Sequence, residues 1–332
     1  MSRVCYLSLI VGFLSGCVPP TESLRDPTQG TPPADQTTAM QMSFPRALAA
    51  RHLANLVQVH DRVISGGLPE GELAFTELTQ LGIKTIISVD SARPDVATAR
   101  KHGLKYVHLP HGYDGISSDR VVQLAKAVRE LDGPIYIHCH HGKHRSPAAA
   151  SVACVAAGLL PASQAVAVLQ LAGTSPNYRG LFEAAARVQP IDLTVLDGLI
   201  VEFPETSSVP PMAEAMVALE RTHEHLLRVA EAGWKSIPEH PDIFPEHEAL
   251  ILEEHFAELR RINDVRLEHP DFARLLQDSE SLAGELKDEL STMAGSAPAA
   301  ETRDILNQLA SEISLNCNRC HQKFRDPPRD AK

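Results

Sequence analysis

The chain lacks the features that mark disulfide-stabilised, nucleic-acid-binding and membrane-spanning proteins. It has only six cysteines in 332 residues, and their spacing predicts no disulfide framework. Acidic residues outnumber basic ones to give a net charge of −11, and most of this excess falls after residue 210, so nucleic acid is not an expected partner. The apolar stretch at residues 4–13 is too short to span a bilayer. What the chain does have is three short cysteine motifs, one near its start, one in its middle and one near its end.

The middle motif reads HCHHGKHRS at residues 138–146, between an apolar run and a helix-forming stretch. This pattern predicts a strand, a tight loop and the start of a helix. Such a loop points backbone N–H groups inward, and the helix N-terminus adds partial positive charge, so the loop can hold a phosphate dianion. Cys139 lies where a thiolate is favoured. Arg145 can bind two phosphate oxygens side by side.

This loop resembles that of the cysteine-based protein phosphatases, specifically the small dual-specificity and tyrosine phosphatases. The resemblance implies that Cys139 attacks phosphorus, Arg145 holds the equatorial oxygens and Ser146 helps the thiolate leave. It also implies that the loop binds phosphate and that the reaction needs no cofactor. The other loop residues are His140, His141, Gly142, Lys143 and His144, of which Gly142 matches the family's invariant glycine.

Two other interpretations compete with this one. A buried cysteine beside a basic turn explains neither the spacing nor the flanking elements. A metal site is the sharper rival, because His138, His140, His141 and His144 surround the thiol. In a tight loop we expect these side chains to splay outward rather than converge on one ion, and in the resembling family the residue at His138 orients the loop.

The resembling family also needs a general acid, because phosphate leaves an alcohol or phenol poorly unless the oxygen is protonated. A glycine-containing stretch at residues 109–117 follows a predicted strand, and Asp114 within it is our candidate. A simple turn aspartate before a glycine is the alternative there. Asp119 is the second candidate, although its position suits a helix start better. His111 is the third.

Alternating patterns predict an α/β domain for residues 46–190, with a mainly parallel sheet, helices on both faces and catalytic loops at the carboxyl ends of the strands. The resemblance to dual-specificity phosphatases covers about residues 52–188. The expected strands are 57–59, 62–67, 84–89, 105–109 and 135–137. The expected helices are 70–81, 96–102, 121–131, 147–157, 161–172 and 179–188. Residues 191–211 are proline-rich and predict a linker.

The end motif reads CNRCH at residues 317–321 and is the pattern for covalent attachment of c-type haem. It would place thioethers on Cys317 and Cys320 and use His321 as an axial iron ligand. A zinc half-site or a redox pair would compete in a cytosolic chain, whereas an exported chain favours haem. Helices expected over 213–232, 246–267, 270–293 and 302–324 predict an all-α four-helix bundle within residues 212–332.

This part resembles cytochrome c-prime over about residues 211–325, with specificity at the motif. The resemblance implies haem c on the last helix and, since such bundles often pair, allows a homodimer. Some relatives supply a methionine from the first helix as sixth ligand, and Met212 and Met216 lie there. We prefer a core-filling role for both, which would leave the haem five-coordinate and open to a small gas.

The first motif, LSGC at residues 14–17, resembles a bacterial lipobox. It implies a signal peptide over 1–16, lipid on Cys17, a flexible tether over 17–45 and membrane attachment through the lipid. An ordinary secretory peptide is the alternative. Val18 is not the aspartate of inner-membrane retention, so the resemblance points to the outer membrane, facing the periplasm. Cys154 alone is unassigned; we expect a buried apolar role, and a redox partnership with Cys139 is the alternative.

Taken together, the sequence predicts a periplasm-facing lipoprotein that hydrolyses phosphomonoesters of a protein or a small molecule. A haem c module on the same chain would serve electron transfer, with a periplasmic redox partner, or redox or gas sensing. The alternative is a haem electron carrier or sensor whose first domain only binds a phosphorylated ligand.

Overall fold

The structure is a computed structural model that describes residues 44–262, 264–293 and 297–326. The predicted signal peptide, the lipidation site Cys17 and almost all of the predicted tether lie outside these residues. Within the described ranges, none of the helices combines the length and apolar character needed to cross a membrane.

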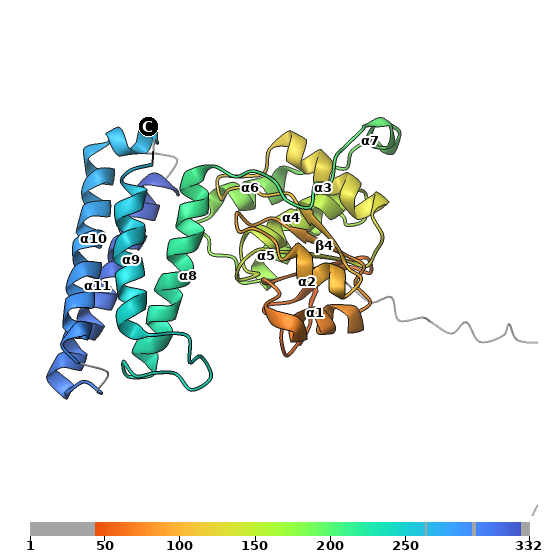
Figure 1. The fold of residues 1–332 in the computed structure, drawn as a ribbon. Coiled ribbons are helices and arrows are strands. Elements are labelled where there is room, and N and C mark those ends of the chain that lie inside the picture. Colours follow the sequence, from red (N-terminus) through yellow and green to blue (C-terminus); the bar gives the residue numbers. More distant parts are fainter. Residues whose placement is uncertain (1–43, 263, 294–296, 327–332) are drawn as a thin grey trace, which may run out of the picture. The chain divides into compact units, whose positions relative to one another are not determined.

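The first part is built on a six-stranded sheet in the order β1-β2-β3-β6-β4-β5 (Figure 1). Strands β3, β6, β4 and β5 run parallel, whereas β2 pairs antiparallel with β3, and β1 pairs antiparallel with β2. The bounds are β1 Arg46–Ala47, β2 Val57–His60, β3 Val63–Gly66, β4 Thr85–Ser88, β5 Lys105–His108 and β6 Ile135–His138. The predicted α/β class is confirmed. The two-residue strand β1 was not predicted, because it is too short to show an apolar pattern.

Helices cover both faces of this sheet. Helices α1 (Gly71–Gln80) and α2 (Val96–Lys101) pack on one face, and α3 (Ser118–Glu130), α4 (Arg145–Ala156), α5 (Ala165–Leu171) and α6 (Arg179–Arg187) pack on the other. Alternate strand residues supply the two cores: Ile86 and Tyr106 belong to the first, and Ile87 and Val107 to the second. The strands therefore read as continuous apolar runs, which is the pattern of a sheet buried on both faces.

Two helices of the α/β part begin earlier than their apolar periodicity predicts. Helix α3 starts at Ser118 because the Ser117 hydroxyl accepts a hydrogen bond from the Arg120 amide and caps the helix. Helix α4 starts at Arg145, directly after the motif loop. The start of α4 places Arg145 and Ser146 in its first turn, where the helix dipole is felt most strongly.

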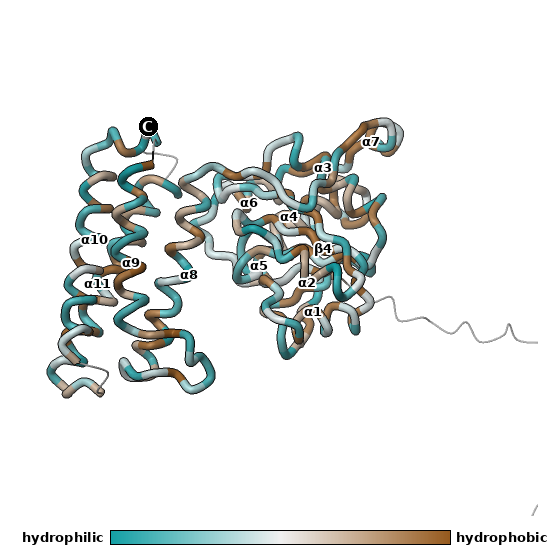
Figure 2. Tube along the Cα trace, viewed as in Figure 1, coloured by the Kyte–Doolittle hydropathy of each residue, from teal (hydrophilic) through white to brown (hydrophobic). Residues whose placement is uncertain are grey.

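The segment at 191–211, predicted as a linker, contains the short helix α7 (Leu193–Gly198) and lies along the α/β part. The Lys126 ammonium donates to the Leu196 carbonyl at 2.9 Å, and the His108 amide donates to the Pro204 carbonyl at 2.8 Å. Figure 2 shows apolar residues around α7, where Val195 and Ile200 are exposed.

The C-terminal part is helical, as predicted. Helices α8 (Pro211–Glu231), α9 (Pro245–Leu259), α10 (Pro270–Ser291) and α11 (Ala300–Phe324) pack in a closed cycle around one apolar core, α8 against α9 and α11, and α10 against α9 and α11. Helix α9 ends at Leu259 rather than near 267, because the Asp264 carboxylate accepts the Arg266 amide and starts a 3-10 turn instead.

Candidate active site

The motif loop, residues 139–144, connects the central strand β6 to α4. Cys139 is 3% exposed, and its Sγ lies 3.3 Å from the Ser146 Oγ. The Ser146 hydroxyl also donates to the Gly66 carbonyl at 2.9 Å, so the thiol and the hydroxyl are held at the carboxyl ends of β3 and β6. The topology thus places the cysteine where ligands bind in open α/β sheets.

Gly142 is the position in this loop that no other residue fits without strain. Its φ is +71°, and a Cβ there would lie 2.5 Å from both the Gly66 carbonyl carbon and the Gly67 nitrogen. Two hydrogen bonds of 2.9 Å hold the loop next to this contact. The Leu68 backbone amide donates to the His140 carbonyl, and the Asn55 side-chain Nδ2 donates to the Gly142 carbonyl. The glycine is therefore required by a close backbone approach.

Arg145 is buried at the base of α4, with one nitrogen paired and another free. Its Nη2 donates to the Asp90 carboxylate at 2.9 Å, and its guanidinium lies 4.6 Å from the centre of the Tyr113 ring. The Arg145 Nε is buried and makes no hydrogen bond to any described residue. A buried donor normally has a partner, and a planar guanidinium offers Nε and Nη in the spacing that two phosphate oxygens accept.

Asp90 is the site residue that the sequence analysis missed. It is 2% exposed, follows β4, and accepts both the Arg145 guanidinium and the His140 amide, the latter at 2.6 Å. Burial alone would raise the pKa of Asp90, but the Arg145 charge and the N–H donors hold it below its ordinary value. The available signal was its position: an acid at the end of a buried parallel strand lies at the same sheet edge as the loop after β6.

The four histidines of the motif have different environments. His138 is fully buried, with its Nε2 2.6 Å from the Tyr106 hydroxyl oxygen, and burial lowers the pKa of His138 to about 4. His144 lies against the Tyr178 ring at a centroid distance of 4.5 Å, and burial lowers the pKa of His144 to about 4 as well. Both are therefore neutral at pH 7 and hold the two ends of the loop in place.

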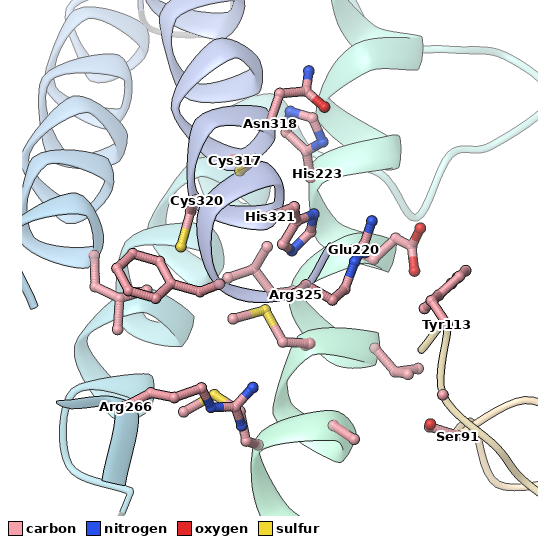
Figure 3. A pocket seen from close by; sticks show the side chains of 18 of the residues that line it. Ser91, Tyr113, Glu220, His223, Arg266, Cys317, Asn318, Cys320, His321 and Arg325 are labelled. Carbon is pink, nitrogen blue, oxygen red and sulfur yellow. The ribbon is translucent and has the colours of Figure 1, made fainter. Parts of the chain in front are cut away.

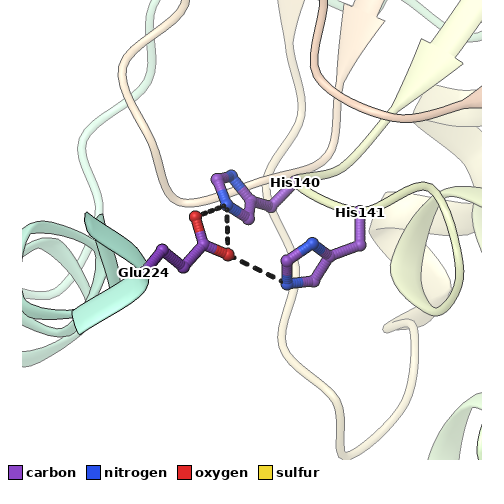
Figure 4. Close-up of side chains that lie close together, drawn as sticks. All are labelled: His140, His141 and Glu224. Atoms are coloured by element: carbon purple, nitrogen blue, oxygen red, sulfur yellow. Dashed lines mark hydrogen bonds and ion pairs between the residues drawn. The ribbon is translucent and has the colours of Figure 1, made fainter. Parts of the chain in front are cut away.

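His140 and His141 depart from the expectation that the loop histidines splay apart. Both point their Nε2 atoms at Glu224 of α8, at 3.1 Å for His140 and 3.5 Å for His141 (Figure 4). The hydrogen bond that the Glu224 carboxylate accepts from His140 raises the pKa of His140 and lowers the pKa of Glu224. Glu224 is one of the acidic residues in excess after residue 210, and the fold brings its carboxylate to the motif loop.

The three candidate general acids differ in position and environment. Asp114 is exposed on the loop before α3, and the backbone of this loop is tight against Gly180 at the start of α6, where a Cβ would lie 2.2 Å from the Asp114 carbonyl carbon. Asp119 lies in the first turn of α3. Burial lowers the pKa of His111 to about 4, so this side chain is neutral at pH 7 and lacks the imidazolium form that would act as a general acid.

A cavity of about 830 Å³ is lined both by residues beside the motif loop and by residues of the CNRCH motif (Figure 3). Tyr113, Asp114 and Arg145 line it from the α/β part, and α8 and α11 line it from the helical part. From α8 the lining includes Met212 and Met216, and from α11 it includes Cys317, Cys320 and His321.

The cavity fits the haem that the motif implies. The Cys317 and Cys320 thiols are free and three residues apart on one helix, so both can reach the same side of a flat group. Burial lowers the pKa of His321 to about 4, which keeps the imidazole neutral as iron ligation requires. The volume of the cavity lies within the range of small-molecule and cofactor pockets.

No protein-family model matches the chain, and no curated protein matches it. Solved structures that resemble it include TpbA of P. aeruginosa, alone and as a variant in complex with pTyr, at 21% identity and a TM-score of 0.38, over 45% of this chain and 92% of that chain. The core catalytic domain of the PP-IP phosphatase SIW14 from S. cerevisiae, in complex with citrate, resembles it at 18% identity and a TM-score of 0.34, over 41% of this chain and 87% of that chain.

Proposed function

We propose that this protein is a cysteine-dependent phosphatase that hydrolyses phosphomonoesters through a phosphocysteine on Cys139. The observation that carries the proposal is the buried Arg145 Nε, which has no hydrogen-bond partner among the described residues and lies in the first turn of α4, directly after the loop that begins at Cys139. A phosphate dianion would supply that partner and balance the positive charge at the start of α4.

In the first step, the Cys139 sulfur attacks phosphorus and the bond from phosphorus to the leaving oxygen breaks. Asp114 gives its proton to that oxygen, so the leaving group departs as a neutral alcohol or phenol. In the second step, water attacks phosphorus, Asp114 takes the proton from the water, and the phosphorus–sulfur bond breaks. The Ser146 hydroxyl, 3.3 Å from the sulfur, can turn from the Gly66 carbonyl to stabilise the departing thiolate.

The test uses the full-length protein with p-nitrophenyl phosphate as substrate. Replacing the nucleophile, Cys139→Ser, should lower kcat by at least about 10³-fold. The matched control is Cys154→Ser, because Cys154 is equally buried and lies further along α4. Acid quenching of the wild-type reaction should trap phosphate on the peptide that contains Cys139. Full activity in Cys139→Ser would end the proposal.

We further propose that the helical part holds a c-type haem, bound through Cys317 and Cys320 with His321 as axial ligand. The supporting observation is the cavity that these three residues line together with Met212 and Met216. When bound, the haem would supply one-electron or gas-binding chemistry. This favours a second candidate function, in which the protein is a haem electron carrier or sensor and the α/β part only binds a phosphorylated ligand.

Two measurements separate these functions. After expression with c-type haem maturation, a pyridine haemochrome spectrum should show haem that survives denaturation, and Cys317→Ser with Cys320→Ser should abolish it while Cys154→Ser keeps it. Turnover of p-nitrophenyl phosphate distinguishes an enzyme from a phosphate-binding module.

Because Asp114 and His321 line one cavity, we also expect the haem state to alter the phosphatase rate. Equal rates with oxidised, reduced and nitric-oxide-bound haem would contradict this.

We also propose that Cys17 is lipidated and that the protein faces the periplasm from the outer membrane. The support is the lipobox-like sequence at residues 14–17 and the need to attach c-type haem outside the cytoplasm. A mature protein whose first residue carries lipid, in the outer-membrane fraction, is the expected result. Retention of residues 1–16 in a cytoplasmic protein would contradict it.

A further inference from the structure

Two neighbouring loop histidines and a carboxylate from a distant helix meet beside the catalytic loop. The Nε2 atoms of His140 and His141 and a carboxylate oxygen of Glu224 all lie within 4.8 Å of one another (Figure 4). The chain separates Glu224 from His140 by 84 residues, so the meeting is produced by the fold. Neither the phosphatase chemistry nor the haem motif uses these three side chains.

The distances between these atoms match the edges of a metal coordination shell. Metal–nitrogen and metal–oxygen bonds of about 2.0–2.2 Å in a tetrahedron put neighbouring ligand atoms roughly 3.3–3.6 Å apart. The His140 Nε2 lies 3.2 Å from the Glu224 Oε1, and the His141 Nε2 lies 3.5 Å from the same oxygen. An ion could therefore bind with small side-chain adjustments and no movement of the loop.

The chemistry of the donors selects the class of ion. Imidazole nitrogen suits zinc and its neighbours in the first transition row, whereas magnesium and calcium take oxygen ligands. Glu224 supplies one negative charge, and Glu220, whose Oε1 lies 3.6 Å from the His141 Nε2, supplies a second nearby. Two carboxylates beside two neutral imidazoles balance the charge of a divalent cation.

The site is also accessible. The side chain of His141 is 47% exposed and that of Glu224 is 27% exposed, so an ion can enter from solvent. Three protein ligands leave one position of a tetrahedron for water or another ligand, which is the arrangement of an open site rather than a closed structural one.

We propose that His140, His141 and Glu224 form a binding site for one zinc-class divalent ion, which ties α8 to the loop that begins at Cys139. Two consecutive ligands come from the loop and the third from the same helix, α8, that carries Met212 and Met216 in the cavity lining. The ion would thereby fix the helix that lines the cavity against the loop that binds phosphate. The proposal is independent of the phosphatase reaction, since it concerns binding of a metal ion.

The experiment titrates the full-length protein with ZnCl₂ by isothermal calorimetry at about pH 8, because metal binding takes imidazole ligands in their neutral form. We expect one ion per chain, with no comparable binding of MgCl₂. Glu224→Gln, which keeps the size of the side chain, and His141→Ala should each weaken zinc binding at least tenfold. Glu231→Gln is the matched control, because Glu231 is an exposed glutamate at the far end of the same helix and should leave the affinity unchanged.

X-ray absorption spectroscopy at the zinc edge identifies the ligand atoms and distinguishes this site from binding at a thiol. A shell of nitrogen and oxygen at about 2.0–2.1 Å is expected, whereas a sulfur shell at about 2.3 Å would place the ion on a cysteine and overturn the proposal. Equal zinc affinity in the wild type, Glu224→Gln and His141→Ala would also overturn it, and so would the absence of binding. In either case the three side chains would form only a hydrogen-bonded ion-pair cluster.

Discussion

Replacing Asp90 should reveal how the buried Arg145 side chain is held in place. Asp90 and Arg145 form an ion pair in which the side chains are 2% and 6% exposed, with 2.9 Å between Oδ2 and Nη2. Asp90→Ala removes the carboxylate and leaves a buried guanidinium without its counter-charge. It also removes the acceptor of the His140 and Ala92 amides, which now bond to Asp90 at 2.6 and 3.1 Å.

The expected loss is large relative to the stability of a domain. Breaking a buried pair by removing one partner costs about 3–5 kcal/mol, because an uncompensated charge stays in a poorly solvated place. A domain of this size has a total stability of about 5–15 kcal/mol, so the loss is a considerable fraction of the whole. Asp90→Asn should cost less, since its amide oxygen can still accept one of the two N–H groups.

Urea unfolding followed by two probes measures this loss. The single tryptophan, Trp234, is buried in the helical part, so its fluorescence reports the bundle, whereas far-UV circular dichroism also follows the α/β part. Asp90→Ala should shift the α/β transition and leave the tryptophan signal nearly unchanged. Asp197→Ala is the control: the Asp197 side chain is 57% exposed and pairs with Arg129 on the surface, so the change should be at most about 1 kcal/mol.

Oxyanions provide a second readout of the same effect. Inorganic phosphate should stabilise Asp90→Ala more than the wild type, because in the variant it meets an Arg145 charge that Asp90 no longer balances. An unfolding free energy for Asp90→Ala within about 1 kcal/mol of the wild type would refute the reasoning, because it would mean that solvent or another group balances Arg145.

Three further predictions follow from the loop and its supports. Gly142→Ala should lower phosphatase activity more than tenfold and cost at least about 1 kcal/mol of unfolding free energy, because an L-residue is strained at this positive φ and its Cβ meets the β3 backbone. Gly180→Ala should lower kcat by displacing the Asp114 loop, whereas Gly198→Ala, where a Cβ meets nothing within 4 Å, should not; equal kcat values would separate Asp114 from the reaction. The pKa of His138 is about 4 in the folded protein and about 6.5 unfolded, so the unfolded state binds more protons between these values; lowering the pH from 6.5 to 5 should cost about 1.6 kcal/mol from this residue, and His138→Asn should flatten the pH dependence of urea unfolding.

The fold could be predicted closely because its signals are local. Buried parallel strands read as apolar runs, helices read as 3.6-residue patterns, and the order of the two fixed the class. The errors came from features that local patterns do not carry. The Ser117 cap extended α3, and a 3-10 turn capped by the Asp264 side chain follows α9 where the pattern predicted more helix.

The site divides in the same way. The sequence alone predicted the chemistry that we propose for each motif, because a cysteine, a glycine and an arginine at fixed spacing, or two cysteines and a histidine on one helix, lie within a few residues of one another. Only the tertiary structure decided which distant groups meet these motifs. Asp90 pairs with Arg145, and Glu224 pairs with His140 and His141. The CNRCH motif and Tyr113 line the same cavity. The reason is that such contacts depend on which strand ends share a sheet edge and on where two separately formed cores come together, and neither leaves a periodic trace in the chain.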